Sequence, residues 1–361
     1  MTGLVFDPAT IGPTCLVTGA NGYLGRHLVR RLVETGCRVR AFDVVPYAGD
    51  APADVLAGDV RIYSDVLSAC EGVDTVFHTA VWINLLARYR LEQRLQAFEV
   101  NVLGTEHIVR ACRAAAVGRL VHTSSFNVAM GKAVSNGDES TPTVGEGDLL
   151  DLYSETKTLS EGVVLAADES GGLRTVALRP GGLWGPGEDS MMIRGFVEQL
   201  ASGRFKVLVG DGRALLDNTH VENAVDAHLL AAQKLFETPD VVGGQVYCVT
   251  DAEPMNGIEW FRPLVEGLGH PWPSLRIPGW LLYFVAALLE WLHFVGGPQP
   301  SLTRRGVLNI TRDGYFRIDK ARDQLGFVPR IRAAEGLPAI LPDARKLYDR
   351  CAPTAAAGRR R

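Results

Sequence analysis

The sequence has few of the features that mark disulfide-rich, metal-binding or nucleic-acid-binding proteins. No two cysteines form a CxxC pair, and most lie in apolar patterns typical of buried strands or helices. We therefore expect reduced, buried thiols, no disulfide framework and no metal site. The six cysteines are Cys15, Cys37, Cys70, Cys112, Cys248 and Cys351. The formal net charge of -4 offers no broad positive field, which argues against nucleic acid as a partner.

Signals for membrane targeting are also scarce. The first 13 residues have no basic segment followed by an apolar run, so the sequence predicts no secretion signal and a cytoplasmic location. One segment, residues 277–295, has nearly the length needed to cross a bilayer. Pro278 and Gly279 open it, however, and Glu290 and His293 interrupt it. The pattern favours a buried helix or one at a membrane surface, so peripheral membrane contact through 277–295 stays open.

What the chain does have is length and an alternating pattern. Its 361 residues, 47% hydrophobic and 22% charged, suit a globular protein with more than one core. The first half alternates β-rich runs with helical patterns such as Tyr23–Val33, which predicts an α/β fold with a doubly wound parallel (Rossmann) sheet. The expected strands are Thr14–Thr18, Arg38–Phe42, Thr75–Thr79, Arg119–Thr123, Thr175–Arg179 and Gln245–Val249.

The alternation weakens after Pro180, where glycine and proline increase. We expect a nucleotide-binding domain over residues 12–190, with 220–251 returning to its sheet. A smaller, mainly helical substrate-binding lobe is expected over 191–350. Ligands of such sheets bind beyond the carboxyl ends of the strands, where the motifs below fall.

A glycine loop stands between the first predicted strand and the first helix. In CLVTGANGYLGRHL, Gly19, Gly22 and Gly25 allow a tight turn and a close approach to a pyrophosphate. The helix that follows offers backbone N–H groups to the phosphates. We therefore predict a dinucleotide site at Gly19, Asn21, Gly22, Tyr23, Leu24 and Gly25.

Further cofactor contacts are predicted at the ends of the next strands. Asp43, 18 residues after Gly25, can accept hydrogen bonds from ribose hydroxyls and would repel a 2′-phosphate, which favours NAD over NADP. Asp59 and Val60 are candidates to flank the adenine. Thr79 and Ala80 are small enough to leave room for the cofactor. For each of these positions, the alternative is an ordinary strand end with no cofactor contact.

The proton-transfer group is predicted at Tyr153 and Lys157. They lie four apart in a helical pattern and so share a face. An ammonium there lowers the pKa of the phenol from about 10, and such a tyrosine can exchange a proton with an alcohol during hydride transfer. Ser125 is the candidate to bind the substrate oxygen, with Ser124 as the competing choice. Asn101 is expected to serve a water relay, a backbone clamp near Lys157, or only an exposed helix position.

Together, the glycine loop, Asp43, Ser125 and the Tyr153/Lys157 pair resemble the extended short-chain dehydrogenase/reductase family over roughly residues 12 to 345. Within it, VHTSSFNVAMG, LYSETKTLSE, LRPGGLWGPGED and VLVGDGRALLDNTHVENAV are similar to the 3β-hydroxysteroid dehydrogenase group. That group includes the decarboxylating sterol-4α-carboxylate 3-dehydrogenases. Sugar-nucleotide epimerases usually carry Val-Tyr-Gly after the serine strand, whereas here Val128 begins Val-Ala-Met-Gly.

The resemblance implies specific roles. Tyr153 would be the catalytic acid/base, Lys157 its activator and ribose anchor, Ser125 the substrate-orienting serine and Pro180 a neighbour of the nicotinamide. The leading hypothesis is NAD-dependent oxidation of a 3β-hydroxyl on a steroid or sterol-like molecule, with decarboxylation or double-bond isomerisation where the substrate permits.

Other functions stay open at this point. They are reduction of long-chain β-keto acids and sugar-nucleotide epimerase or dehydratase chemistry. A non-enzymatic nucleotide sensor is disfavoured because Tyr153 and Lys157 are both present. A homodimer is a further possibility, since dimerisation through a helix pair is common in the family.

Overall fold

A computed structural model describes residues 4–84, 90–144, 152–187, 190–300 and 302–352. Contacts divide the chain into two compact units. The first comprises residues 1–181, 221–252 and 316–330, and the second comprises 182–220, 253–315 and 331–361.

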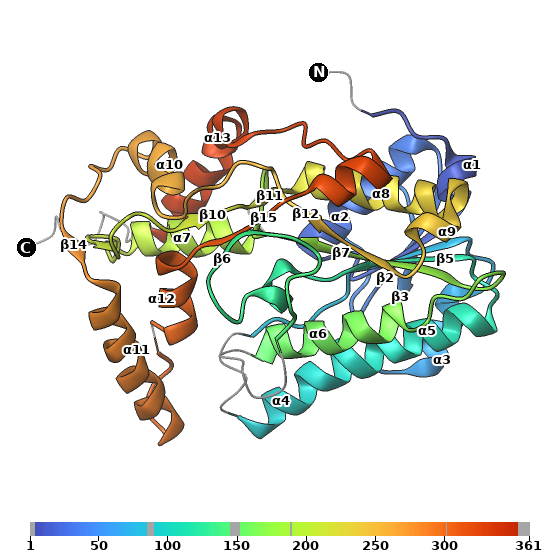
Figure 1. Cartoon of the computed structure of the whole chain (residues 1–361), viewed down its shortest axis with the longest axis horizontal. Coiled ribbons are helices and arrows are strands. Elements are labelled where there is room, and N and C mark those ends of the chain that lie inside the picture. The colour runs from blue at the N-terminus through green and yellow to red at the C-terminus, as the bar shows by residue number, and fades with distance from the viewer. Residues whose placement is uncertain (1–3, 85–89, 145–151, 188–189, 301, 353–361) are drawn as a thin grey trace, which may run out of the picture. The chain divides into compact units, whose positions relative to one another are not determined.

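The first unit is built on a seven-stranded sheet in which all neighbours are parallel, in the order β12-β7-β5-β4-β1-β2-β3 (Figure 1). Its strands are β1 (Thr14–Thr18), β2 (Arg38–Asp43), β3 (Asp54–Ala57), β4 (Thr75–His78), β5 (Arg119–Thr123), β7 (Arg174–Pro180) and β12 (Gln245–Val249). The order reverses at β1, where β4 lies on one side and β2 on the other. This α/β, doubly wound fold confirms the predicted class, and the reversal point is where such sheets bind ligands.

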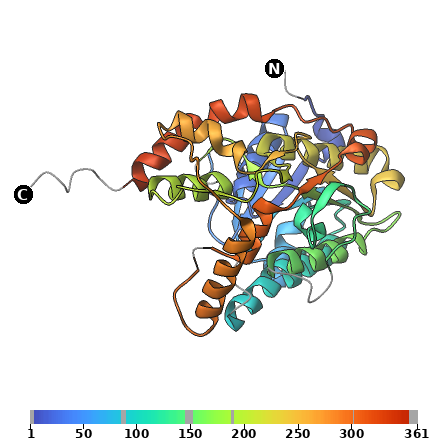
Figure 2. The ribbon, with the colours of Figure 1, turned by 60° about the vertical axis from the view of Figure 1, so that its left-hand side comes forward.

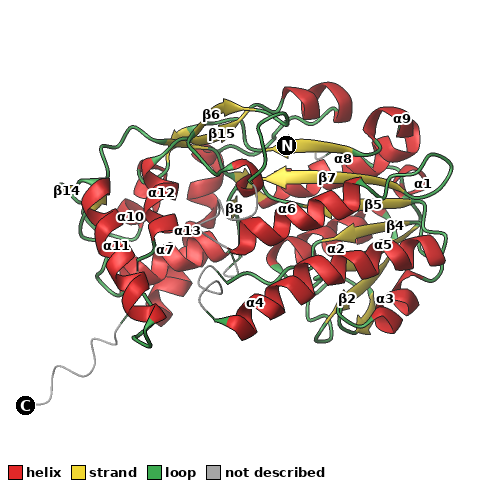
Figure 3. Cartoon of the chain, turned by 60° about the horizontal axis from the view of Figure 1, so that its bottom comes forward, coloured by secondary structure: helices red, strands yellow, loops and turns green. Residues whose placement is uncertain are grey.

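Helices cover both faces of this sheet. Those on one face, α3, α5 and α6, lie in front of the strands in Figure 3, and α2 and α8 lie on the other face. The helices of this unit are α1 (Pro8–Ile11), α2 (Tyr23–Thr35), α3 (Tyr63–Cys70), α4 (Leu91–Phe98), α5 (Gly104–Ala114), α6 (Leu152–Leu165), α8 (Val221–Glu237) and α9 (Pro239–Val242). Since both faces are covered, the central strands are buried almost along their whole length: β4 is buried throughout, and only Thr14 of β1 is half-buried.

Short elements complete the first unit. A π-helix, η2 (Glu99–Leu103), joins α4 to α5, and a 3₁₀-helix, η3 (Phe126–Ala129), follows β5. A second π-helix, η5 (Ala321–Leu325), and the strand β6 (Val134–Gly137) also belong here. Residues 316–330, expected in the second lobe, return to the first unit instead. Their return places Phe316 against Phe126, with ring centroids 5.7 Å apart, and lets Lys320 donate to Gln245 of β12.

The second unit has its own core, centred on Trp184, Phe196, Trp260 and Leu337. In Figure 2 the helices α7, α10 and α13 lie close together, and α13 contacts the other two. Its helices are α7 (Met191–Ala201), η4 (Glu259–Phe261), α10 (Arg262–Gly267), α11 (Gly279–Phe294), α12 (Arg304–Thr311) and α13 (Ala333–Cys351). The short strands are β8 (Leu183–Trp184), β9 (Leu208–Val209), β10 (Leu215–Leu216), β11 (Thr219–His220), β13 (Met255–Asn256) and β14 (Arg276–Ile277), and β15 (Gly314–Phe316) crosses the unit boundary.

Two sequence predictions about which residues are buried need correction. Five of the six cysteines are buried free thiols, but Cys351 is exposed at the end of α13. Most of the apolar segment 277–295 forms α11, which is not buried as one alternative expected: Trp280, Phe284 and Phe294 are each about two-thirds exposed. Among the described residues, no helix is both long enough and apolar enough to span a membrane.

Candidate active site

The glycine loop closes tightly against the strand beside it. Gly19 has a φ of +70°, and a Cβ at this position would stand 2.7 Å from the Cα of Ala80. A Cβ at Gly25 would stand 2.1 Å from the carbonyl oxygen of Gly19. Only hydrogen fits at either position, so the turn from β1 into α2 depends on glycine. Thr79 completes this contact by donating from its hydroxyl to the carbonyl of Thr18, at 2.7 Å.

Asp43 and Asn21 join the glycine loop to the end of β2. The carboxylate of Asp43 accepts from the backbone N–H of Asn21 at 2.9 Å and from that of Val44 at 2.8 Å. The side chain of Asn21 in turn donates to the carbonyls of Val45 and Pro46 and accepts from the N–H of Ala48. The predicted ribose-binding acid is thus fixed beside the loop, whereas the Asn21 amide serves the protein itself.

The start of α2 suits an anion. Its N-cap is Gly22, which is exposed and has no side chain to cap the helix, and the first helical residues are Tyr23 and Leu24. A helix N-terminus presents backbone N–H groups and the positive end of the helix dipole. The residues present therefore fit the pyrophosphate of a dinucleotide. Two observations support this fit: the close backbone contacts at Gly19 and Gly25, and an N-cap residue, Gly22, without a side chain.

Asp59 and Val60 follow β3, one strand further out. The N–H of Gly58 donates to the carbonyl of Asp43, which ties this segment to the ribose end of the predicted site. The Asp59 carboxylate pairs with Arg61 at 2.6 Å, and this hydrogen bond lowers the pKa of Asp59. Val60 is buried, and its carbonyl lies 3.0 Å from Nδ1 of His107. The role of both in holding adenine stays a prediction.

Lys157 is buried in the middle of α6, one helical turn after the half-buried Tyr153. Its ammonium donates to the carbonyl of Thr123, the last residue of β5, and lies 3.4 Å from Nε2 of His122. Burial lowers the pKa of Lys157 to about 7, while the charge of Glu161 opposes this shift. A lysine that changes charge near neutral pH is typical of a functional site.

The two serines after β5 have different partners. Ser124 donates from its hydroxyl to the buried Glu161 carboxylate at 2.6 Å, and Glu161 also pairs with Arg179 at 2.6 Å. Ser125 caps the short 3₁₀-helix by accepting from the N–H of Asn127 at 3.2 Å. Ser124 is therefore occupied by a buried ionic cluster, and this favours Ser125 as the serine that faces a substrate.

Asn101 is buried, so the exposed-position alternative is wrong. It lies in the π-helix η2, and its side chain clamps the backbone of Trp82: Oδ1 accepts from the N–H at 2.8 Å and Nδ2 donates to the carbonyl at 3.0 Å. Nδ2 also donates to the Thr156 hydroxyl at 2.9 Å, and that hydroxyl donates to the carbonyl of Tyr153. π-Helical turns occur often at functional sites. Here the turn aims Asn101 at the helix that carries Tyr153 and Lys157.

Sequence reasoning overlooked several partners of these groups. Thr156, His122 and Thr123 all contact predicted site residues, yet none is part of a sequence motif with a recognisable spacing. Pro180, predicted to lie near the nicotinamide, ends β7 as a buried residue. All the predicted site residues thus belong to the first unit. They end its strands, follow the carboxyl ends of its strands, or lie on α2, α6 and η2.

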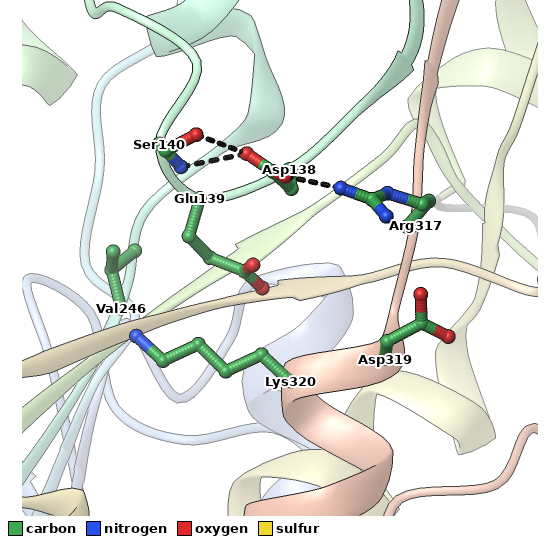
Figure 4. Close-up of a pocket in the computed structure, with 7 residues that line it drawn as sticks. All are labelled: Asp138, Glu139, Ser140, Val246, Arg317, Asp319 and Lys320. Carbon is green, nitrogen blue, oxygen red and sulfur yellow. Dashed lines mark hydrogen bonds and ion pairs between the residues drawn. The ribbon is translucent and has the colours of Figure 1, made fainter.

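A separate polar pocket of about 490 Å³ lies at the other edge of the sheet, on β12. Figure 4 shows Asp138 bonded to Ser140 and to Arg317 within it. Glu139, also in the pocket, accepts from the N–H of Cys248 at 2.7 Å and so covers an edge-strand donor. No predicted site residue lines this pocket. Glu139 and Lys320 are thus the charged residues of this pocket that hydrogen-bond to the edge strand β12.

The parallel sheet, the glycine loop at its reversal point and the buried lysine on α6 define a nucleotide-dependent oxidoreductase of the extended short-chain dehydrogenase class. The chain belongs to the 3-beta hydroxysteroid dehydrogenase/isomerase family, whose model matches residues 16–278. It is therefore an oxidoreductase that acts on CH–OH groups. NAD(P) binding is typical of this family.

Two curated relatives illustrate the similarity. Short-chain dehydrogenase/reductase family 42E member 1 of Danio rerio is 42% identical over 330 residues, covering 88% of this chain and 84% of the relative. The 3 beta-hydroxysteroid dehydrogenase/Delta 5→4-isomerase of Mycobacterium tuberculosis is 41% identical over 334 residues, covering 91% and 89%. A solved structure of MoeE5 with UDP-glucuronic acid and NAD superposes with a TM-score of 0.71 at 24% identity, covering 92% of this chain and 99% of that one. The last likeness concerns the fold alone.

Proposed function

We propose that this protein oxidises the 3β-hydroxyl of a steroid or sterol-like molecule with NAD as the hydride acceptor. The observation that carries the proposal is the likeness, along 91% of the chain, to a relative named for this activity. The retention of Tyr153 and Lys157 on one helix supports it, because both are needed to move the alcohol proton. Asp43, a carboxylate held beside the glycine loop, supports NAD over NADP.

Each group then has a defined task. Bound NAD supplies the hydride acceptor. The Tyr153 phenolate takes the proton of the substrate alcohol, and the Ser125 hydroxyl orients the alcohol oxygen. Lys157, held by the Thr123 carbonyl, favours the ionised form of Tyr153 while it carries a charge. Asn101 fixes the start of this helix through Thr156 and so keeps Tyr153 in place.

A direct test is incubation of the purified protein with NAD and a panel of 3β-hydroxysteroids, with their 3α-epimers as matched controls. We expect NADH to form with the 3β-epimers only, a 3-ketone to appear in equal amount, and NADP to be used far less well. For substrates with a 5,6-double bond, ultraviolet absorbance of the conjugated enone reports any isomerisation. Absence of NADH with the whole panel, or activity only as NADPH-dependent reduction of β-keto acids, would overturn the proposal.

We also propose that α11 rests on a membrane surface. The polar residues of this helix face the protein: Glu290 is 5% exposed and pairs with Arg304 at 2.6 Å. Its large apolar residues face outward, with Trp280 and Phe284 each 66% exposed. A protein in water gains nothing from this arrangement, whereas the interface of a bilayer accommodates aromatic side chains. A substrate of low water solubility is also found there.

Vesicle sedimentation tests this contact. We expect the protein to pellet with phosphatidylcholine vesicles, and a Trp280→Ser/Phe284→Ser double variant to stay in the supernatant with its oxidation of dissolved substrate unchanged. Phe236→Ser is the control for loss of an exposed aromatic side chain elsewhere, because Phe236 is on α8, is 56% exposed and contacts Arg119 with its ring. Equal sedimentation of the double variant and the control would contradict a role of α11 in membrane contact.

A further inference from the structure

The acceptors around Lys157 come from two consecutive residues of β5. The ammonium donates to the Thr123 carbonyl and lies 3.4 Å from Nε2 of His122. Thr123 is itself fixed, because its hydroxyl lies 2.7 Å from Nε2 of His228, whose Nδ1 donates to the carbonyl of Ala224. Lys157, His122 and His228 are all buried. Helix α8, which lies on the other face of the sheet, thus holds Thr123, the residue whose carbonyl accepts from the Lys157 ammonium.

The carboxylate of Glu161 is held by groups other than Lys157. Glu161, one turn further along α6, is held by Arg179 through Nη2 at 2.6 Å and Nε at 2.9 Å. The Ser124 hydroxyl also donates to it. With this carboxylate occupied, the His122 imidazole is the neutral group placed to accept a second N–H of Lys157.

The other ring nitrogen of His122 is the unusual feature. Nδ1 is buried, and none of the described residues offers it a hydrogen-bond partner. Nε2, by contrast, has two neighbours: the Lys157 ammonium, and the Ser160 hydroxyl at 3.5 Å, which donates to the Lys157 carbonyl and so can accept in return. With its proton on Nδ1, the ring presents a lone pair to a charged lysine. With its proton on Nε2, it suits a neutral lysine.

Only one of these two groups changes charge near neutral pH. Burial lowers the pKa of His122 well below its usual value, and the charges of Lys157, His78 and His228 lower it further. His78, on β4, lies with its ring 5.3 Å from that of His122 and is itself kept neutral by burial. Near Lys157, Glu161 on the same helix forms a buried ion pair with Arg179 on β7, and the charge of Glu161 partly opposes the lowering of the Lys157 pKa.

We propose that His122 is a positioning residue for Lys157. Its Nε2 accepts an N–H of the ammonium and holds it at the Thr123 carbonyl, and the ring changes tautomer when the lysine loses its proton. His122 thereby sets the pH range in which Lys157 is charged. The inference rests on the proposed function, in which a charged Lys157 favours the ionised form of Tyr153.

Matched substitutions test which ring nitrogen matters. In His122→Gln, the carboxamide oxygen falls near the place of Nε2, whereas in His122→Asn the amide falls near Nδ1. His122→Phe removes both acceptors. Loss of one hydrogen bond to the charged lysine lowers the pKa of Lys157, so the limb of the kcat profile on which Lys157 loses its proton shifts to lower pH by about one unit. We expect this shift in the Phe and Asn variants, a limb close to the wild-type position in the Gln variant, and little change in KM for the steroid.

Two kinetic results would overturn the proposal: an Asn variant with the wild-type profile, or a Gln variant as shifted as the Phe variant. Thermal unfolding of each variant shows whether the fold is retained. If the Phe variant does not fold, the comparison of Gln with Asn still decides the matter.

Nuclear magnetic resonance of the free protein gives a readout that needs no substrate. With ¹⁵N-labelled imidazole rings, the signals of the eight histidines distinguish the two tautomers, and the His122→Gln variant assigns the pair of interest. We expect the His122 proton to move from Nδ1 to Nε2 as the pH rises through about 7, and not to move in Lys157→Met. One tautomer throughout overturns the inference. A tautomer change without steroid oxidation would instead count against the proposed function alone.

Discussion

Two neighbouring serines after β5 have different hydrogen-bond partners, so alanine substitutions should affect stability at one and catalysis at the other. Ser124→Ala removes a donor to the buried Glu161 carboxylate, so we expect a loss of about 1–3 kcal/mol in the free energy of unfolding and a nearly unchanged kcat. Ser125→Ala removes a weak cap at 3.2 Å, and should cost only about 1 kcal/mol but lower kcat/KM by a factor of about 10–100. Denaturant unfolding and steady-state kinetics on both variants check the pair. A larger kinetic loss at Ser124 would reverse the assignment.

The individual site residues show where sequence patterns are informative. The four-residue spacing of Tyr153 and Lys157 placed both on α6, because helix geometry alone decides which side chains share a face. The choice between Ser124 and Ser125 needed the structure, since it depends on where Glu161 and Arg179 meet. Asn101 gave a signal, as a polar residue within a helical pattern, but its partners on Trp82 and Thr156 are fixed by tertiary contacts.

Among the elements, the turn from β1 into α2 depends most strongly on one residue type. Gly25→Ala would place a Cβ 2.1 Å from the Gly19 carbonyl oxygen, so α2 must shift away from the strand. We expect NAD binding to weaken by at least about 100-fold, because the backbone can no longer approach the pyrophosphate.

Gly162→Ala is the matched control for this substitution. Gly162 lies on the exposed face of α6, and a Cβ added there would meet no other atom within 4 Å. At this position, alanine should raise the free energy of unfolding by about 0.5–1 kcal/mol and leave NAD affinity unchanged. Calorimetric titration with NAD measures both variants. Tight binding by Gly25→Ala would show that the loop does not cradle a dinucleotide.

Strands and helices of the first unit were largely predictable. Three of the expected strands, Thr14–Thr18, Arg119–Thr123 and Gln245–Val249, match β1, β5 and β12 at both ends. Buried parallel strands give short apolar runs bounded by polar turns, which explains this agreement. The outward-facing apolar side of α11 was not predictable, because a nearly uniform apolar sequence does not tell which side faces the protein. Nor did any pattern mark residues 316–330 as part of the first unit.

For the molecule as a whole, buried histidines couple stability to pH. Burial lowers the pKa of His78 from 6.5 to about 3 and that of His228 from 6.5 to about 4. The unfolded chain therefore binds more protons than the folded protein once the pH falls below 6.5. Stability should then be lost progressively down to about pH 4, by about 1.4 kcal/mol per histidine for each pH unit.

Denaturant unfolding across this range measures the slope. His228→Gln keeps an amide able to accept from Thr123 and removes one titrating group, so the slope should become shallower. His270→Gln is the control, because His270 is half-buried and its ring lies 2.7 Å from the Tyr348 hydroxyl in the second unit. An identical slope in wild type and His228→Gln would contradict this origin of the acid sensitivity.

The central claim is that Tyr153, tuned by Lys157, moves the proton of a 3β-hydroxyl. The most direct measurement compares wild-type protein with Tyr153→Phe in a single assay of NADH formation from NAD and a 3β-hydroxysteroid, alongside NAD binding by calorimetry. We predict that the variant binds NAD within about threefold of wild type and loses at least about 100-fold in kcat, since proton transfer by a positioned group contributes on that order. A variant that oxidises the steroid at the wild-type rate would contradict the account.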